Sequence, residues 1–364
     1  MSISNKKAVS AGTPIHLYTI LALFLFTIPL LAAEKDKSSP KPAKLFTTSE
    51  TLAVTAYAPW RDLERKKKYQ GTYPAKIDFT DELGNTTSLQ MTVERRGRTR
   101  QVVCRFPPIK IRFDKKEVKG TTFSGQKSLK MVTHCQTSSR YEQYYVMEML
   151  IYRMYNFITD FSFRVRPLSI TYVDTEHRGS PDPRFAFLIE DDSDVAKRNG
   201  QKKLKISKTT RKRLDSQETA NFALFQYMIS NLDWSAISGP GVDKCCHNAK
   251  LVGQDPLKDP VYAIPYDFDA AGLINAPYAT PPENLRVRNV KQRLYRGFCA
   301  HNDKLEESRV RFLDSEQSIL ALVRNESLLT SSTQKRALNF LKKFFDTLKN
   351  KQDFQKTIIS KCRK

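Results

Sequence analysis

Five short segments between residues 52 and 133 alternate apolar and polar side chains, and this two-residue period constrains the fold more than any other feature. The segments read LAVTAYA, AKIDFT, SLQMTVERR, IKIRF and SLKMVT. Such alternation is typical of strands that bury one face. Residues 81–85 (DELGN), between the second and third segments, have the composition of a hairpin turn. The pattern therefore predicts a mostly antiparallel sheet in this part of the chain.

The apolar pattern then changes to the period of a helix. Ser139 and Glu142 match a capping box, and apolar or aromatic side chains recur at helical spacing as far as Ile158. These residues predict a helix of about five turns. Two strand-like runs follow, PLSITYV and RFAFLIE, and a second capping box at Asp215 and Glu218 opens another helix. After a loop-rich centre that holds the strand-like VYAIP, the chain ends in helices. The order predicts an α+β chain of two lobes, with an N-terminal mostly antiparallel sheet and a C-terminal mostly helical lobe.

The N-terminus has the layout of a secretory signal peptide. An uncharged apolar run at 17–31 follows Lys6 and Lys7 and precedes Ala32 and Ala33. This order predicts cleavage behind the second alanine and a periplasmic or secreted protein, with an uncleaved membrane anchor as the alternative. The chain holds no second long apolar run, which excludes a polytopic membrane protein.

The rest of the chain divides by composition. Residues 1–33 form the predicted signal peptide, and 34–44, rich in charge, Pro and Ser, are interpreted as a flexible tether. We expect a β-rich N-terminal region at 45–135. An α/β and helical region, with the candidate active site, follows at 136–364.

Six cysteines are spread over the exported part of the chain. An even number in an oxidising compartment predicts disulfide bonds, and the sequence leaves their pairing open. We expect the adjacent Cys245 and Cys246 to bond to two different partners, because a disulfide between neighbours is strained.

One acidic residue falls on an aromatic helix face. Glu148 lies seven residues from both Tyr141 and Tyr155. A carboxylate on a buried face needs a cation, and Lys130 in the preceding strand-like segment is the expected partner. The pair is interpreted either as a structural ion pair or as the support of a phosphate-binding lysine.

The densest group of chemistry-bearing residues lies at 231–272. Asp267 and Asp269 follow an apolar strand two residues apart, so both project from one side of an extended segment. With the amide oxygen of Asn248 they form an all-oxygen set that suits Mg²⁺ or Mn²⁺ bridging to phosphates. Asp233, after a helix, could orient or deprotonate a hydroxyl nucleophile. The alternative is that the two acids cap a loop and bind nothing.

Six blocks of the sequence form a recognisable set: NLDW from Asn231, His247-Asn248, PYDFD from Pro265, GQKSLK ending at Lys130, the helix with Glu148, and FAFLIE ending at Glu190. These blocks resemble the active-site blocks of the CotH (spore-coat protein H) family of atypical secreted protein kinases. The likeness covers roughly residues 109–272 in block order.

The resemblance implies an ATP-dependent kinase with the atypical kinase-like two-lobed fold, acting on Ser or Thr of an exported protein with Mg²⁺ or Mn²⁺. By this resemblance Lys130 would contact the ATP phosphates, Glu148 would hold that lysine in place, and Glu190 would lie in the hinge strand beside adenine. Asp233 would be the catalytic acid–base. Asn248 and Asp267 would bind the metal ion, with Asp269 as a second acid.

The spacing departs from the family at one point. Asp233 and Asn248 are fifteen residues apart, whereas in the family the asparagine follows the catalytic aspartate closely. Asp243 stands five residues before Asn248, which is the kinase spacing. Asp243 therefore remains the alternative catalytic residue.

The formal net charge of +23 is concentrated at 65–68, 95–100 and 197–213. Clustered positive charge attracts polyanions. An exported protein meets little nucleic acid, so we expect lipopolysaccharide, anionic lipid or an acidic substrate protein. The alternative to a kinase is a non-catalytic CotH-like envelope protein that binds a polyanion or an assembly partner.

Overall fold

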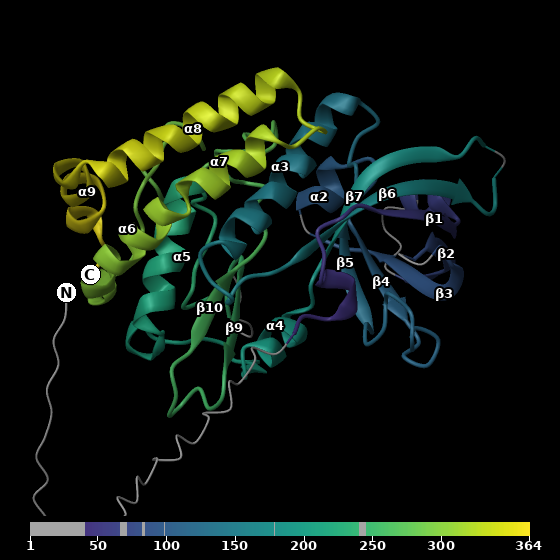
Figure 1. Ribbon diagram of the computed structural model, residues 1–364, viewed down its shortest axis with the longest axis horizontal. Coiled ribbons are helices and arrows are strands. Elements are labelled where there is room, and N and C mark those ends of the chain that lie inside the picture. The colour runs from purple at the N-terminus through teal and green to yellow at the C-terminus, as the bar shows by residue number, and fades with distance from the viewer. Residues whose placement is uncertain (1–40, 66–70, 82–83, 98, 178, 240–244) are drawn as a thin grey trace, which may run out of the picture. The chain divides into compact units, whose positions relative to one another are not determined.

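The computed structural model describes residues 41–65, 71–81, 84–97, 99–177, 179–239 and 245–364 (Figure 1). The predicted signal peptide, most of the predicted tether and Asp243 lie outside these residues. The described strands are β1 (Leu52–Ala58), β2 (Tyr73–Thr80), β3 (Thr86–Arg95), β4 (Ile109–Phe113), β5 (Ser128–Val132), β6 (Val165–Asp174), β7 (Asp182–Ile189), β8 (Lys202–Lys203), β9 (Ala249–Gly253) and β10 (Tyr262–Pro265).

Helices precede, interrupt and follow these strands. The α-helices are α1 (Trp60–Arg65), α2 (Thr99–Val103), α3 (Ser139–Asn156), α4 (Asp192–Arg198), α5 (Ser216–Ile229), α6 (Leu305–Asp314), α7 (Glu316–Arg324), α8 (Ser331–Lys349) and α9 (Lys351–Thr357). The 3₁₀ segments are η1 (Lys44–Phe46), η2 (Arg211–Arg213), η3 (Cys299–Lys304) and η4 (Ile359–Lys361). No described helix has both the length and the apolar character that crossing a bilayer requires.

Seven strands close into a barrel in the order β1-β2-β3-β4-β5-β7-β6. Every neighbouring pair is antiparallel except β1 and β6, which run parallel from Leu52 opposite Leu168 to Ala58 opposite Asp174. The strands bury alternate side chains, as in β1, where Leu52, Val54, Ala56 and Ala58 are buried. The barrel interior is therefore a hydrophobic core of its own.

The predicted kinase-like two-lobed fold is wrong, because the sheet does not stay open. β6 and β7, which belong to the predicted second region, fill the gap between β1 and β5. Closure pairs the backbone N–H and C=O groups that two open edges would leave exposed. The alternation along each strand does not encode which strand lies beside it, so the sequence pattern could not reveal this closure.

The local predictions agree better with the structure. The segments read as strands coincide with β1 to β7 and β10, and the expected hairpin joins β2 to β3. Asp215 caps α5, since its carboxylate accepts the Glu218 N–H at 2.8 Å. The helix at α3 is confirmed, but its predicted capping box is wrong: Ser139 is the first helical residue, and the N-cap Ser138 makes no side-chain cap bond.

Outside the barrel, α3 packs against β6 and β7 on one side and α7 on the other (Figure 1). α3 and α5 share the larger core with the C-terminal helices α6 to α9. A small sheet of order β10-β9-β8 adjoins them, with β10 against α5 (Figure 1).

The cysteines pair as Cys104–Cys135, Cys299–Cys362 and Cys245–Cys246. Disulfide bonding is therefore as predicted. The expectation that Cys245 and Cys246 have different partners is wrong, since each is the partner of the other.

Candidate active site

A cavity of about 700 Å³ lies where α2, α3, the small sheet and the segment after β10 meet. It is lined by residues that are distant in the sequence, among them Arg100, Glu148, Asp233, Asn248 and Asp267. Its volume is in the range of small-molecule sites in proteins, about 300–1,000 Å³. Most of the candidate residues from the sequence therefore face one space.

Asp233 lies just beyond the C-terminus of α5 and is held by the side chains around it. Its backbone N–H donates to Asn231 Oδ1 at 3.1 Å, and its Oδ1 lies 2.5 Å from His247 Nε2. Asn248 Nδ2 donates to Asp233 Oδ2 at 2.9 Å and to the Asp233 carbonyl at 2.7 Å. An antiparallel bridge between Ser235 and His247 folds the long connection back on itself. Asp233 and Asn248, fifteen residues apart in the sequence, are therefore in direct contact.

Asn248 directly precedes β9 and Asp267 lies two residues beyond β10, so both are at the same end of the small sheet. Pairing of β9 with β10 brings the Tyr266 N–H to the Asn248 carbonyl at 3.1 Å. Both residues have positive φ, +48° for Asn248 and +61° for Asp267. Non-glycine residues with such φ values are uncommon and cluster at functional sites, although Asn and Asp tolerate them best.

The Asp267 carboxylate is open to the cavity, with 38 % of its side chain exposed. Desolvation, followed by the negative charge of Asp269, raises its pKa. A cation bound at this position would offset both effects.

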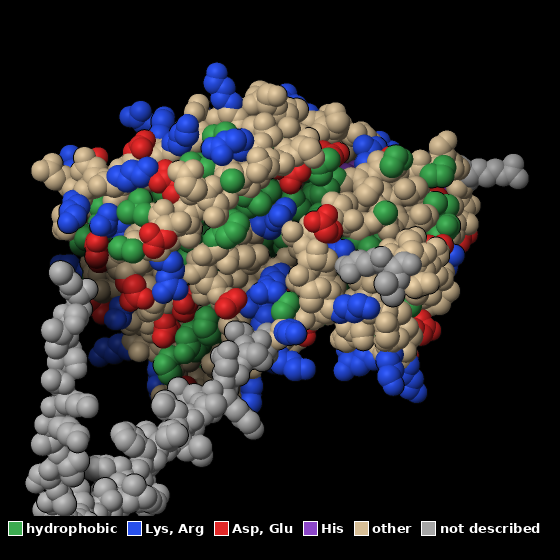
Figure 2. All heavy atoms as spheres, in the orientation of Figure 1, with side chains coloured by type: hydrophobic (Ala, Val, Ile, Leu, Met, Phe, Trp, Pro, Cys, Tyr) green, Lys and Arg blue, Asp and Glu red, His purple; other side chains and the backbone are tan. Residues whose placement is uncertain are grey.

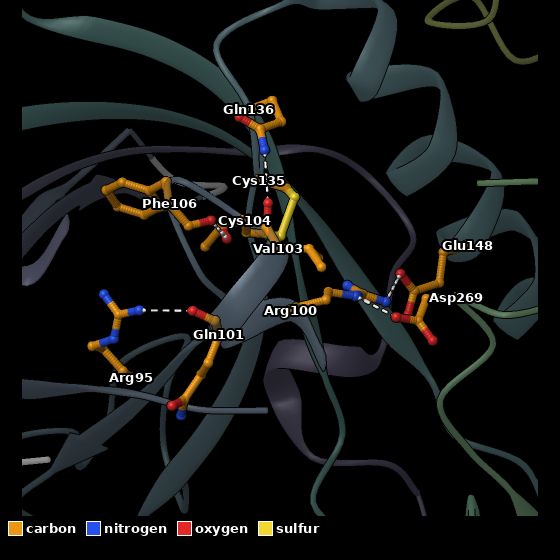
Figure 3. The surroundings of a disulfide bond; sticks show 11 residues. Arg95, Arg100, Gln101, Val103, Cys104, Phe106, Cys135, Gln136, Glu148 and Asp269 are labelled. Carbon is orange, nitrogen blue, oxygen red and sulfur yellow. Dashed lines mark hydrogen bonds and ion pairs between the residues drawn. A yellow bond between two sulfur atoms is a disulfide. The ribbon is translucent and has the colours of Figure 1, made fainter. Parts of the chain in front are cut away.

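Arg100 lines the cavity and connects three acids, two of which, Glu148 and Asp269, are drawn in Figure 3. Its Nη2 lies 2.6 Å from Glu148 Oε2, and its Nε lies 2.7 Å from Asp269 Oδ2. The Asp267 carboxylate is 3.8 Å from the same guanidinium. Burial would lower the pKa of Arg100, but the carboxylates of Glu148 and Asp269 raise it well above its usual value. Burial also raises the pKa of Glu148 to about 7, against the opposing effect of Arg100.

Lys130, the expected partner of Glu148, lies in a different group of charges. Its Nζ is 4.9 Å from the centre of the Tyr266 ring, and Lys250 Nζ lies 5.0 Å from the same ring. Arg96 donates to the Tyr266 hydroxyl. Desolvation lowers the pKa of Lys130 to about 8, with the positive charges of Lys250 and Arg96 acting in the same direction and the carboxylate of Asp192 opposing them. Three cations are thus crowded beside Tyr266, a charge arrangement that an anion would relieve.

Glu190 does not line the cavity. It follows β7, is fully buried, and accepts from Arg198 Nε at 3.0 Å and from the Arg164 N–H at 3.0 Å. Its carboxylate is therefore committed to an internal ion pair, and the neighbouring Ile189 and Asp192 line the cavity in its place.

Sequence reasoning gave Arg96, Arg100, His247 and Lys250 no role in the active site, although it counted residues 95–100 among the basic clusters that attract a polyanion. Arg96 and Arg100 belong to the run RRGRTR, which has the composition of a solvated basic face. Of the four, only His247 stood inside a quoted motif. Neither arginine carries a local signal, because its partners lie more than forty residues away in the sequence.

The donor set at this site partly fits Mg²⁺ or Mn²⁺. Both Asn248 N–H contacts go to Asp233, which leaves the amide oxygen as the atom for a cation, beside the open Asp267 carboxylate. Asp269 fits less well, since Arg100 already neutralises it. Mg²⁺ commonly binds through one or two protein oxygens plus phosphates and water. Within the described residues, no three or more His, Cys, Asp or Glu side chains converge in a metal-binding arrangement.

Comparison with known protein families, with curated proteins and with solved structures finds no match to this chain.

Proposed function

We propose that the cavity binds ATP and that the chain transfers its γ-phosphoryl group to a Ser or Thr hydroxyl of an exported protein. One observation carries this proposal. Arg96 and Lys250 line the cavity close to a group of oxygen ligands and a general base, and Lys130, which does not line it, lies beside the same Tyr266 ring. Phosphoryl transfer depends on neutralising phosphate charge and on orienting a hydroxyl, and these two groups meet both needs.

In this proposal Asp233 orients the substrate hydroxyl and accepts its proton. Its Oδ1 contacts His247 and its Oδ2 accepts from Asn248, so the carboxylate has one fixed orientation. Asn248 and Asp267 would hold the metal ion. When bound, Mg²⁺ or Mn²⁺ supplies positive charge that neutralises the phosphate oxygens.

Arg96 and Lys250 would contact the phosphates, and Lys130, beside the same Tyr266 ring, would add positive charge behind them. With a pKa of about 8, Lys130 is mostly protonated at pH 7 and loses its charge as the pH rises through 8. We therefore expect ATP affinity to fall between pH 7 and 9.

The test is incubation of the full chain with γ-labelled ATP, Mn²⁺ and a mixture of Ser and Thr peptides. Asp233→Asn and Asp267→Asn should each lower transfer by at least about a hundredfold, because each removes a group that acts directly on the reaction. EDTA should abolish it. Asp346→Asn, an exposed change on α8, is the matched control and should have no effect.

Absence of ATP binding in the unaltered chain would refute the proposal. Transfer that survives Asp267→Asn would refute the metal assignment. Loss on Asp243→Asn with activity kept in Asp233→Asn would move the base to the alternative residue.

The second candidate is a non-catalytic envelope protein that binds a polyanion such as lipopolysaccharide or anionic lipid. Exposed basic side chains along residues 202–213 favour it. The predicted signal peptide and three disulfides agree with either role outside the cytoplasm.

A further inference from the structure

Residues 202–213, which we name the basic strip, run from the cavity towards α5. Its sequence, KKLKISKTTRKR, has seven basic residues and no acidic one. All of the basic side chains except that of Arg213 are exposed. In Figure 2, Lys and Arg side chains gather along the lower edge of the molecule, below the barrel and around α4 and β9 as labelled in Figure 1.

Backbone hydrogen bonds hold the basic strip against the segment that carries Asp233 and Asn248. The Leu204 N–H donates to the Leu251 carbonyl at 3.0 Å, and the Ile206 carbonyl accepts from Cys245 at 2.9 Å. Further along, the Thr209 N–H donates to the Ile237 carbonyl at 3.0 Å. The strip is therefore a fixed outer layer beside the proposed base.

Residues 203–206 of the strip line the cavity, and the two apolar side chains among them are also partly buried against a hydrophobic core. Leu204 and Ile206 pack on the core around Trp234 and Leu251. Lys203 and Lys205 line the cavity. The positive surface is thus continuous from the cavity along the exposed side of the strip.

Most of this charge is uncompensated. Lys203 pairs with Asp192 at 2.8 Å, and it is the only basic residue of the strip with an ion pair to a described residue. Arg211 rests over the Phe298 ring at 5.8 Å. Uncompensated positive charges gathered along one segment attract an anion, and the attraction weakens as salt is added.

We propose that the basic strip docks an acidic segment of the protein substrate and presents its hydroxyl to Asp233. This inference rests on the proposed kinase function and names its substrate class. The basic residues of the strip are spaced one to three residues apart, so an acidic segment with several carboxylates would contact more than one of them.

Two features favour a peptide over other polyanions. The strip contains no aromatic residue on which nucleic-acid bases could stack. Its two apolar side chains are packed against a hydrophobic core, so it has none to insert into a membrane.

The experiment compares three peptides that differ only in the residues flanking one serine: Glu, Gln or Lys. Binding is measured by fluorescence anisotropy without nucleotide at low and high salt, and phosphorylation is measured with labelled ATP. The Glu peptide should bind at least about tenfold tighter than the Gln peptide at low salt, and the difference should shrink at high salt.

The variant is Lys208→Glu/Lys212→Glu, which changes exposed positions outside the cavity. We expect KM for the Glu peptide to rise at least about tenfold, with kcat and the KM for ATP within about twofold of the unaltered chain. The matched control is Lys342→Glu/Lys343→Glu on the exposed face of α8, which makes the same charge change and should leave all three constants unaltered.

The outcomes separate the two proposals. Strip-dependent binding of the Glu peptide without phosphorylation would support docking and refute the kinase function. Equal phosphorylation of all three peptides, or equal loss in the control variant, would overturn docking and leave the kinase function standing. Tighter strip-dependent binding of a single-stranded oligonucleotide or of phosphatidylglycerol vesicles would also overturn it.

Discussion

Arg100 is the residue on which the charge balance of the candidate site depends. Its guanidinium neutralises Glu148 and Asp269, and it is itself only 6 % exposed. Removing one partner of a buried ion pair is costly, because the remaining charge stays desolvated. Three acids converge on this cation, so its loss would leave more than one carboxylate uncompensated.

Arg100→Met should therefore lower the free energy of unfolding by about 3–5 kcal/mol at pH 8. The loss should be smaller at pH 5. Glu148 has a folded-state pKa of about 7, above its usual value, so the folded state binds this proton more tightly than the unfolded chain. The stability that this bound proton adds is present at low pH and is lost as the pH rises through 7. At pH 5 Glu148 is therefore protonated, and Arg100→Met does not leave it as an uncompensated carboxylate.

Urea unfolding at the two pH values measures this difference. Arg112→Met is the control, because it breaks an exposed pair with Glu94 and should cost less than about 1 kcal/mol at either pH. An equal loss at pH 5 and pH 8 for Arg100→Met would contradict the role given to Glu148.

Among the elements, α2 is the short helix that carries Arg100 to the cavity. It is anchored at its C-terminal side by Cys104–Cys135 and by Gln136 Nε2, which donates to the Val103 carbonyl at 2.8 Å (Figure 3). On its other side, Arg95 Nη2 donates to the Gln101 carbonyl at 3.2 Å. A helix of one turn has little stability alone, so these anchors set the position of Arg100.

Cys104→Ser/Cys135→Ser should lower the free energy of unfolding by roughly 3–4 kcal/mol, from the entropy of the opened loop. It should also lower ATP affinity, since Arg100 loses its support.

Cys299→Ser/Cys362→Ser opens a longer loop remote from α2, with a sequence separation of 63 against 31, and is the matched control. It should destabilise the chain by a similar amount with ATP affinity unaltered. Calorimetric titration with ATP under conditions where both variants are folded tests this, and an equal loss of affinity would show that α2 is not specifically involved.

At the scale of the whole molecule, the barrel joins the two regions that the composition separates. β1 and β5 have their outer partners, β6 and β7, beyond residue 135. The polypeptide 41–135 should therefore fail to fold, because its end strands would be unpaired and its hydrophobic core open. We expect an undispersed amide NMR spectrum from this fragment and a dispersed one from 41–364. A dispersed spectrum from the fragment would mean that the first five strands form an independent unit.

Most of the outcomes follow from the range over which a signal acts, and the local capping box at Ser139 is the exception. Strand alternation and the Asp215 cap depend on neighbours a few residues apart, and both appear where the sequence puts them. Asp233 and Asn248 each belong to a short motif that marked them as site residues, and in the structure their side chains are hydrogen-bonded to each other. Arg100 carried no signal, because its partners lie 48 and 169 residues away.

Local chain chemistry thus decides which segments are strands or helices and which side chains face inward, since periodicity and capping are properties of short windows. Tertiary packing decides the rest. The closure of the barrel, the pairing of Arg100 with Glu148 and the burial of Glu190 against Arg198 each depend on which distant surface a residue meets. Desolvation is the physical reason: a buried hydrogen-bonding or charged group must find a partner, and only the assembled fold determines which partner is within reach.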